Sequence, residues 1–206
     1  MDKITELIEI GIGSLIPIYD GDMGNATKIV TADGQIYIED KVLKTVLRIL
    51  CKYYTVHIES CREKYGRMLH RRLGVPLPIH SRLLLVPFKM RKPMFNKDGA
   101  YGYVNLYDID RIEEKRGQGV ISLQSGVDIP CLHKVHTMQQ HINQARLVAG
   151  NIPLYQRVEA VKEDGEDFYE VSQRPATKAD IAILKNEIVE LRRVLKRGTM
   201  TMKKET

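Results

Sequence analysis

The stretch Ala26–Glu39, ATKIVTADGQIYIE, alternates apolar and polar side chains on both sides of Asp33-Gly34. Alternation with a period of two is typical of β-strands, and an Asp-Gly pair between two such runs indicates a tight hairpin turn. We therefore expect two antiparallel strands here. The preceding segment SLIPIY, Ser14–Tyr19, predicts a further strand, so the chain up to Asp40 is expected to be β-structure.

Downstream of this hairpin the apolar spacing changes to that of a helix. In DKVLKTVLRILCKYY, Asp40–Tyr54, apolar residues recur every three or four positions, and Asp40 is the expected N-cap. The next segment, CREKYGRMLHRRLG, is expected to be helical at least in part and to end at Gly74. Its apolar side chains fall on one face of such a helix: Tyr65, Met68, Leu69 and Leu73.

The remainder up to position 150 predicts more β-structure and one helix. Val75–Phe88 is expected to be extended but broken by its prolines, including Pro87, and Lys89–Tyr103 to be a polar, basic and flexible loop. VNLYDIDRI, Val104–Ile112, indicates a short helical or turn element. Gly119–Pro130 predicts a second hairpin across Ser125-Gly126, and a helix is expected from about His133 to Ala149. The fold class is therefore α+β: a β-rich domain of hairpins with packed helices, over residues 1–150.

The last quarter of the chain is expected to form a separate unit. Residues 151–175 carry six carboxylates against three cations and are interpreted as an acidic connector. Residues 176–198 have the heptad spacing of a coiled-coil-like helix, and residues 199–206 are expected to be a disordered tail. The predicted dimerisation residues are Ile181, Leu184, Ile188, Leu191 and Leu195. Because only about two heptads are present, docking of this helix onto its own domain stays open as the alternative.

Charge is distributed unevenly along the chain. The net charge is +6, yet residues 61–97 hold ten cations and the single carboxylate Glu63. Such an uneven distribution of charge is typical of a surface that binds a polyanion, whereas a surface that only keeps the protein in solution usually mixes positive and negative side chains. Lys64, Arg67 and Arg71 recur by three and four residues, which places them on one side of a helix. The predicted DNA-binding residues are Arg62, Lys64, Arg67, Arg71, Arg72, Lys89, Arg91, Lys92 and Lys97.

The sequence gives little support to catalysis or to a cofactor. It lacks the phosphate-binding, nucleophile-elbow and dinucleotide motifs, so no enzyme activity, cofactor or metal is expected. Zinc on Cys131, His133 and His136, with His141 nearby, is the alternative left open. The three cysteines show no paired spacing, which indicates reduced thiols and a cytoplasmic protein, nucleoid-associated when bound to DNA. No apolar run is long enough for a membrane helix, and the N-terminus is not typical of a secretory signal.

The order of several short motifs resembles the competence transcription factor (ComK-type) family. These are GQIYIED before a helix, CKYY at its end, YGR in an arginine-rich segment and LGVPLPI, then LLLVPFKMRKP, YGYVNLYDIDRI, VISLQSGVDIP and QQHINQA. The resemblance covers roughly Ala26 to Ala149. Tyr103-Val104-Asn105 stands where the family tends to have Trp-Ile-Ser, and PFKM, Pro87–Met90, replaces a Phe-Pro-Thr-like run. The segment after Pro175 has no counterpart. The segment from YVNLYDIDRI to VISLQSGVDIP is also similar to the second half of a LytTR-type DNA-binding domain.

This resemblance implies a transcriptional activator that binds A/T-rich promoter boxes in double-stranded DNA as a homodimer and activates competence genes. RNA polymerase or a regulatory adaptor would be a further partner. We therefore expect a sequence-specific DNA-binding regulator in which basic side chains hold phosphates and one or more arginines read the groove. The alternative is an adaptor that binds a protein partner through its coiled coil. A zinc-dependent enzyme is the third hypothesis.

Overall fold

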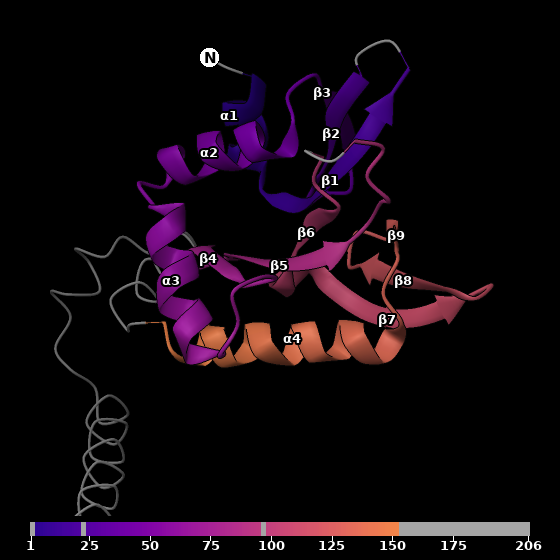
Figure 1. Cartoon of the computed structure of the whole chain (residues 1–206). Helices are drawn as coiled ribbons and strands as arrows, with labels where there is room; N and C mark the ends of the chain where they lie inside the picture. The colour runs from indigo at the N-terminus through magenta and orange to yellow at the C-terminus, as the bar shows by residue number, and fades with distance from the viewer. Residues whose placement is uncertain (1–2, 22–23, 96–97, 153–206) are drawn as a thin grey trace, which may run out of the picture. The chain divides into compact units, whose positions relative to one another are not determined.

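The computed structural model describes residues 3–21, 24–95 and 98–152, which form one α+β unit of antiparallel sheets and four α-helices (Figure 1). The predicted fold class is confirmed at this level. In chain order the elements are α1 (Lys3–Ile10), β1 (Ile12–Asp20), β2 (Gly24–Thr31), β3 (Ile36–Glu39), α2 (Leu43–Tyr53), α3 (Ile58–Met68), β4 (Leu77–His80), β5 (Leu83–Lys89), β6 (Tyr101–Asn105), the 3₁₀ turn η1 (Leu106–Asp108), β7 (Ile109–Lys115), β8 (Gln118–Leu123), β9 (Asp128–Cys131) and α4 (Val135–Gly150).

The six-stranded sheet has the order β3-β2-β1-β6-β5-β4, with every neighbouring pair antiparallel. The predicted hairpin at Asp33-Gly34 joins β2 to β3, so this prediction is confirmed. Gly34 has a φ of 87°, which suits glycine, and the Asp33 carboxylate accepts from the Thr31 hydroxyl and from the Gln35 backbone N–H at 3.3 Å. The turn therefore fixes the register of the two strands.

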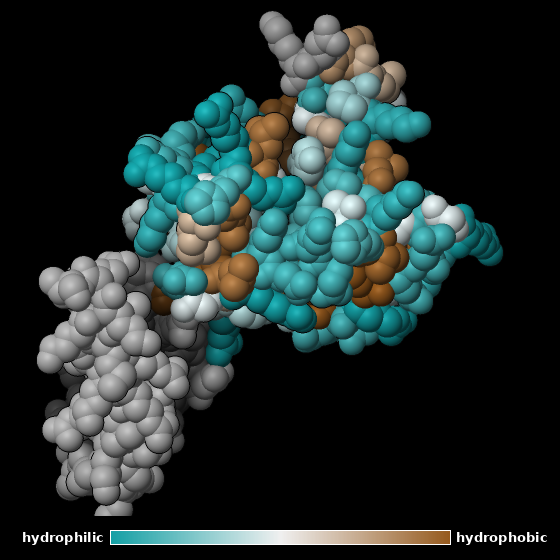
Figure 2. All heavy atoms as spheres, turned by 60° about the horizontal axis from the view of Figure 1, so that its bottom comes forward, coloured by the Kyte–Doolittle hydropathy of each residue, from teal (hydrophilic) through white to brown (hydrophobic). Residues whose placement is uncertain are grey.

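Alternate residues of β2, β5 and β6 face two separate hydrophobic cores. On one face, α1 and α2 pack over Leu15, Ile29 and Leu85. On the other, α4 and the three-stranded sheet β7-β8-β9 pack over Val86 and Phe88. Burial on both faces explains why β5 is apolar along nearly its whole length. The outward side of α4 is polar, and the face seen in Figure 2 is mostly hydrophilic with small, separate hydrophobic patches.

The second predicted hairpin is also confirmed, since β8 and β9 pair across the turn that contains Ser125-Gly126. The helix expected from about His133 to Ala149 is α4, and its residues Met138, Ile142 and Ala145 are buried. The expectation of a helical or turn element over Val104–Ile112 is wrong except for η1, because the flanking residues belong to β6 and β7.

Three boundary predictions are corrected. The first residues form the helix α1, not a strand. Helix α2 begins at Leu43, not at Asp40, and its N-cap Val42 makes no side-chain cap bond. The Thr27 hydroxyl donates to the Lys41 carbonyl at 2.7 Å, and this bond holds the linker along β2. Pro87 does not break β5: it lies beyond the last β4 partner, so its missing N–H leaves no ladder bond unmade.

Apart from Asn151 and Ile152, which directly follow α4, the acidic connector lies outside the described residues, as do the coiled-coil-like helix and the predicted tail. Among the residues that the structure does describe, no helix is long and apolar enough to cross a membrane.

Candidate nucleic-acid interface

Helix α3 carries three of the nine predicted DNA-binding side chains, Arg62, Lys64 and Arg67, and is anchored at both ends. At its start, the His57 imidazole Nδ1 accepts from the Ser60 backbone N–H at 3.3 Å, which caps the helix. Near its end, Tyr65 is buried in the core shared with α4. The opposite side of α3 faces outward and exposes Arg62, Glu63 and Arg67.

The chain turns back sharply after α3, which ends at Met68 and not at Gly74 as expected. His70 adopts a left-handed φ of 51°, and the Arg71 backbone N–H donates to the Gly66 carbonyl at 2.8 Å. A Cβ on Gly66 would lie 2.7 Å from the Arg71 carbonyl oxygen, closer than real Cβ atoms approach. Gly66 is therefore what allows Arg71 and Arg72 to lie beside Arg67.

This turn creates a groove of about 730 Å³, called here the arginine groove. Its lining residues are Arg62, Glu63, Gly66, Arg67, His70, Arg71 and Arg72. Four arginines thus share one hollow with one carboxylate, and that carboxylate, Glu63, pairs with Arg67 one helical turn away. The groove retains a positive excess, which is the electrostatic requirement for a phosphate-binding surface.

Two of the four guanidinium groups are held by contacts within the fold. Arg71 lies beyond the end of α3, so it does not share a helix face with Lys64 and Arg67 as predicted; it donates from Nη1 to Gln144 Oε1 on α4 at 2.5 Å and is half-buried. Arg62 Nη2 lies 3.5 Å from the Tyr103 hydroxyl, which accepts its hydrogen bond. Arg67 and Arg72 are exposed. The groove therefore combines positioned and adaptable donors.

The four apolar side chains expected on one face of this helix do not all lie on the same side in the structure. Tyr65 is buried and Leu69 packs partly against the core, as predicted. Met68 is 37% exposed and Leu73 is 82% exposed, so these two do not support the helix from below. Lys64 does not line the arginine groove. Its Nζ lies 5.1 Å from the centre of the Tyr65 ring, and Lys64 lines a different hollow together with Tyr54 and His80.

The second predicted basic element, Lys89–Lys97, is not assembled with the arginine groove into one hollow. Lys89 is half-buried at the end of β5, Lys92 is exposed, and Lys97 lies outside the described residues. The Arg91 guanidinium donates to the carbonyls of Ile18 and Gly99, both at 2.8 Å, and to Asn25 Oδ1 at 2.9 Å. It also stacks 4.1 Å from the centre of the Tyr19 ring. Arg91 is therefore committed to holding the fold.

The described part of this loop is tied down, contrary to the expected flexibility. The Tyr19 hydroxyl donates to Asp98 at 2.5 Å and accepts from the Met94 backbone N–H at 2.8 Å. Asn25 Nδ2 donates to the other Asp98 oxygen at 3.1 Å. The loop and the β1–β2 hairpin thus form one hydrogen-bonded unit.

Of the side chains considered for zinc, His133 and His141 lie side by side with ring centres 4.9 Å apart, but both bond main-chain atoms of β5, and Cys131 is buried in the core. His141 is buried and donates from Nδ1 to the Pro87 carbonyl at 2.6 Å, and Lys89 N–H donates to His133 Nδ1 at 3.4 Å. His136 is exposed and bonds Gln140. Burial lowers the pKa of His133 to about 4, and it raises the pKa of the Cys131 thiol. Across residues 3–21, 24–95 and 98–152, no three such side chains gather as metal ligands do.

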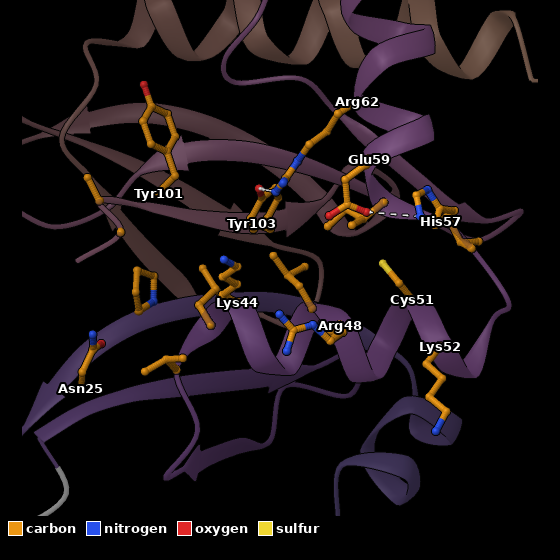
Figure 3. A pocket seen from close by; sticks show the side chains of 18 of the residues that line it. Asn25, Lys44, Arg48, Cys51, Lys52, His57, Glu59, Arg62, Tyr101 and Tyr103 are labelled. Carbon is orange, nitrogen blue, oxygen red and sulfur yellow. Dashed lines mark hydrogen bonds and ion pairs between the residues drawn. The ribbon is translucent and has the colours of Figure 1, made fainter. Parts of the chain in front are cut away.

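Sequence reasoning missed a second row of cations. Lys44, Arg48 and Lys52 recur every four residues along α2, which contains no carboxylate, and all three are exposed. Spacing by four residues places side chains on one helix face, so the sequence held the signal for this row. Lys44 and Arg48 approach Arg62 and Tyr103 from the opposite side of a cleft, while Lys52 points away (Figure 3).

Comparison with known proteins provides no assignment: no protein-family model matches the chain, and neither does any curated protein or solved structure.

Proposed function

We propose that this chain is a sequence-specific double-stranded DNA-binding transcriptional regulator, with the arginine groove as its phosphate-binding surface. The observation that carries the proposal is the gathering of Arg62, Arg67, Arg71 and Arg72 around one hollow whose single carboxylate is already paired. Arginine suits this role because its planar fork binds phosphate oxygens in pairs and also reads guanine edges or a narrow minor groove.

The finer features of the proposal come from the resemblance to competence-type activators. They are a preference for A/T-rich boxes, activation of competence genes and binding as a homodimer. The dimerisation residues of the proposal, Ile181 to Leu195, lie outside the described residues. The resemblance is compatible with the geometry because it spans α3 and the arginine groove.

Fluorescence anisotropy of a labelled A/T-rich duplex tests the proposal at several salt concentrations. Each neutralised phosphate contributes about −0.9 to the slope of log K against log salt, so four arginine contacts predict a slope of roughly −3 to −4 per protomer. A selection of bound sequences from random duplexes then tests specificity. A flat salt response, or binding of all sequences equally, would contradict the proposed regulator.

The matched variants are Arg67→Glu and Arg72→Glu, because both side chains are exposed and their replacement leaves the core unchanged. The control is Arg116→Glu, an equal charge change in the turn between β7 and β8. We expect each groove variant to weaken binding at least about tenfold at low salt, since charge-assisted contacts contribute roughly 1.5–3 kcal/mol. The control should keep its affinity. Equal losses in all three variants would indicate a nonspecific charge effect.

A further inference from the structure

A cleft of about 750 Å³ lies between α2, the start of α3 and the exposed part of the sheet at β1 and β6 (Figure 3). Small-molecule sites commonly have volumes of about 300–1,000 Å³. The cleft exists because α2 covers only part of the sheet on this side. Tyr103 forms part of its wall together with Pro17. The cleft therefore has the dimensions of a binding site for a small molecule.

The polar part of the cleft is cationic. Lys44 and Arg48 reach into it from α2, and Arg62 reaches into it from α3 to meet the Tyr103 hydroxyl (Figure 3). The lining contains one carboxylate, Glu59, whose Oε2 lies 3.7 Å from His57 Nε2. Within the described residues, neither Lys44 nor Arg48 has an ion-pair partner. Their charges are available to a ligand.

The remaining wall is apolar. Leu47 and Tyr103 are buried members of the α2-side core whose surfaces line the cleft, and Leu43 packs beside them. A ligand that is only a charge would leave this wall in contact with water, and a ligand that is only apolar would bury cations without partners. Both outcomes are unfavourable, so the lining selects a ligand with both features.

We propose that this cleft binds an amphipathic anion: a carboxylate, sulfonate or phosphate head joined to an aromatic or aliphatic body. The head contacts Arg48 and Lys44, and the body lies against Leu47 and Tyr103. This site overlaps the proposed DNA contact only at Arg62, because Arg48 and Lys44 do not line the arginine groove. The proposal can therefore hold whether or not the chain binds DNA.

The test compares three probes on the full chain. They are 8-anilinonaphthalene-1-sulfonate, its uncharged analogue N-phenyl-1-naphthylamine, and inorganic phosphate. The sulfonate should bind with one-to-one stoichiometry, and at least about tenfold more tightly than either the uncharged analogue or phosphate, because only the sulfonate uses both walls. Equal binding of the uncharged analogue, or displacement of the dye by phosphate at comparable concentration, would overturn the proposal.

Two variants and one control locate the site. Arg48→Glu should weaken dye binding about tenfold or more, whereas Glu59→Gln should strengthen it, since it removes the only carboxylate of the lining. The control Arg146→Glu makes the same charge change on an exposed position of α4, and it should leave dye binding unchanged. Circular dichroism and thermal unfolding verify the fold of each variant. The proposal is wrong if Arg48→Glu leaves dye binding unchanged, or if Arg146→Glu weakens dye binding as much as Arg48→Glu does.

Discussion

The Arg71 backbone lies directly against Gly66, with its N–H bonded to the Gly66 carbonyl at 2.8 Å and no room between them for a methyl group. This contact returns the chain to α3 and brings the last two arginines of the arginine groove beside Arg67. The shape of the groove therefore depends on a residue that carries no charge.

Gly66→Ala should disrupt the groove and destabilise the fold. The new Cβ would lie 2.7 Å from the Arg71 carbonyl oxygen, and relieving such overpacking costs roughly 1–3 kcal/mol. Urea unfolding measures the loss of stability, and duplex anisotropy should show weaker binding. The control is Gly150→Ala at the end of α4, where an added Cβ meets nothing within 4 Å. Unchanged stability of Gly66→Ala would show that the turn accommodates the methyl group.

Glu63→Gln should tighten binding to DNA. It removes the only carboxylate of the arginine groove and releases Arg67 from its ion pair. Because exposed pairs are worth about 0.2–1 kcal/mol, we expect a gain of up to roughly fivefold at low salt. Glu114→Gln, on β7, is the matched control. Weaker binding of Glu63→Gln would mean that Glu63 orients Arg67 for its contact.

Arg91 and Lys92 are adjacent cations, and their replacement is expected to affect the stability of the fold differently. Arg91→Ala removes two hydrogen bonds and a ring contact between the loop and the β1–β2 hairpin, and one hydrogen bond within the loop, so it should destabilise the fold by roughly 2–4 kcal/mol. Lys92→Ala, an exposed neighbour, should leave stability unchanged. Chemical denaturation of the two variants distinguishes them. Equal stability would show that the guanidinium contacts contribute little.

Stability should fall as the solution becomes acidic, starting near neutral pH. Burial lowers the pKa of His133 to about 4, with His141, Lys89 and Arg71 adding to the effect, and burial also lowers the pKa of His141. In the unfolded chain both histidines titrate near their ordinary pKa of about 6.5. The unfolded state therefore binds more protons in this window. The free energy of unfolding should decrease as the pH falls below about 6.5, by up to about 1.4 kcal/mol per pH unit for each histidine, and for His133 the decrease should continue down to about pH 4.

Urea unfolding between pH 7.5 and 4.5 measures this dependence. His133→Gln should flatten the curve, because an amide does not titrate and its oxygen can still accept from the Lys89 N–H. The exposed His136→Gln is the control and should keep the slope of the original chain. A slope that His133→Gln does not change would assign the acid sensitivity to other groups.

Local signals predicted much of the fold. Asp33-Gly34 and Ser125-Gly126 mark the turns of β2–β3 and β8–β9, and helical spacing identified α4. Helix α1 was missed although Ile4, Leu7 and Ile8 have helical spacing and are buried. These features depend on residues close together in the chain, which is why pattern reasoning can find them.

The candidate site was predicted only in part, because its geometry depends on distant contacts. Charge density alone identified α3 and the arginines after it. Nothing local indicates that Arg91 bonds Asn25, 66 residues away, or that Arg71 bonds Gln144, 73 residues away. The outward position of Leu73 follows from the turn at His70, which depends on the contact of Arg71 with Gly66. The positions of these side chains are determined by tertiary contacts between residues that are far apart in the sequence.

Arg62 lines both the arginine groove and the cleft. Arg62 thus belongs to both proposed sites, and its single charge can pair with an anion in only one of them at a time. If both proposed sites bind their ligands, linkage makes the two equilibria antagonistic, and the factor by which a small anion weakens polyanion binding equals the factor by which the polyanion weakens binding of the small anion. Removing the Arg62 side chain would uncouple the two sites, because Arg48 would remain in the cleft and Arg67 in the arginine groove.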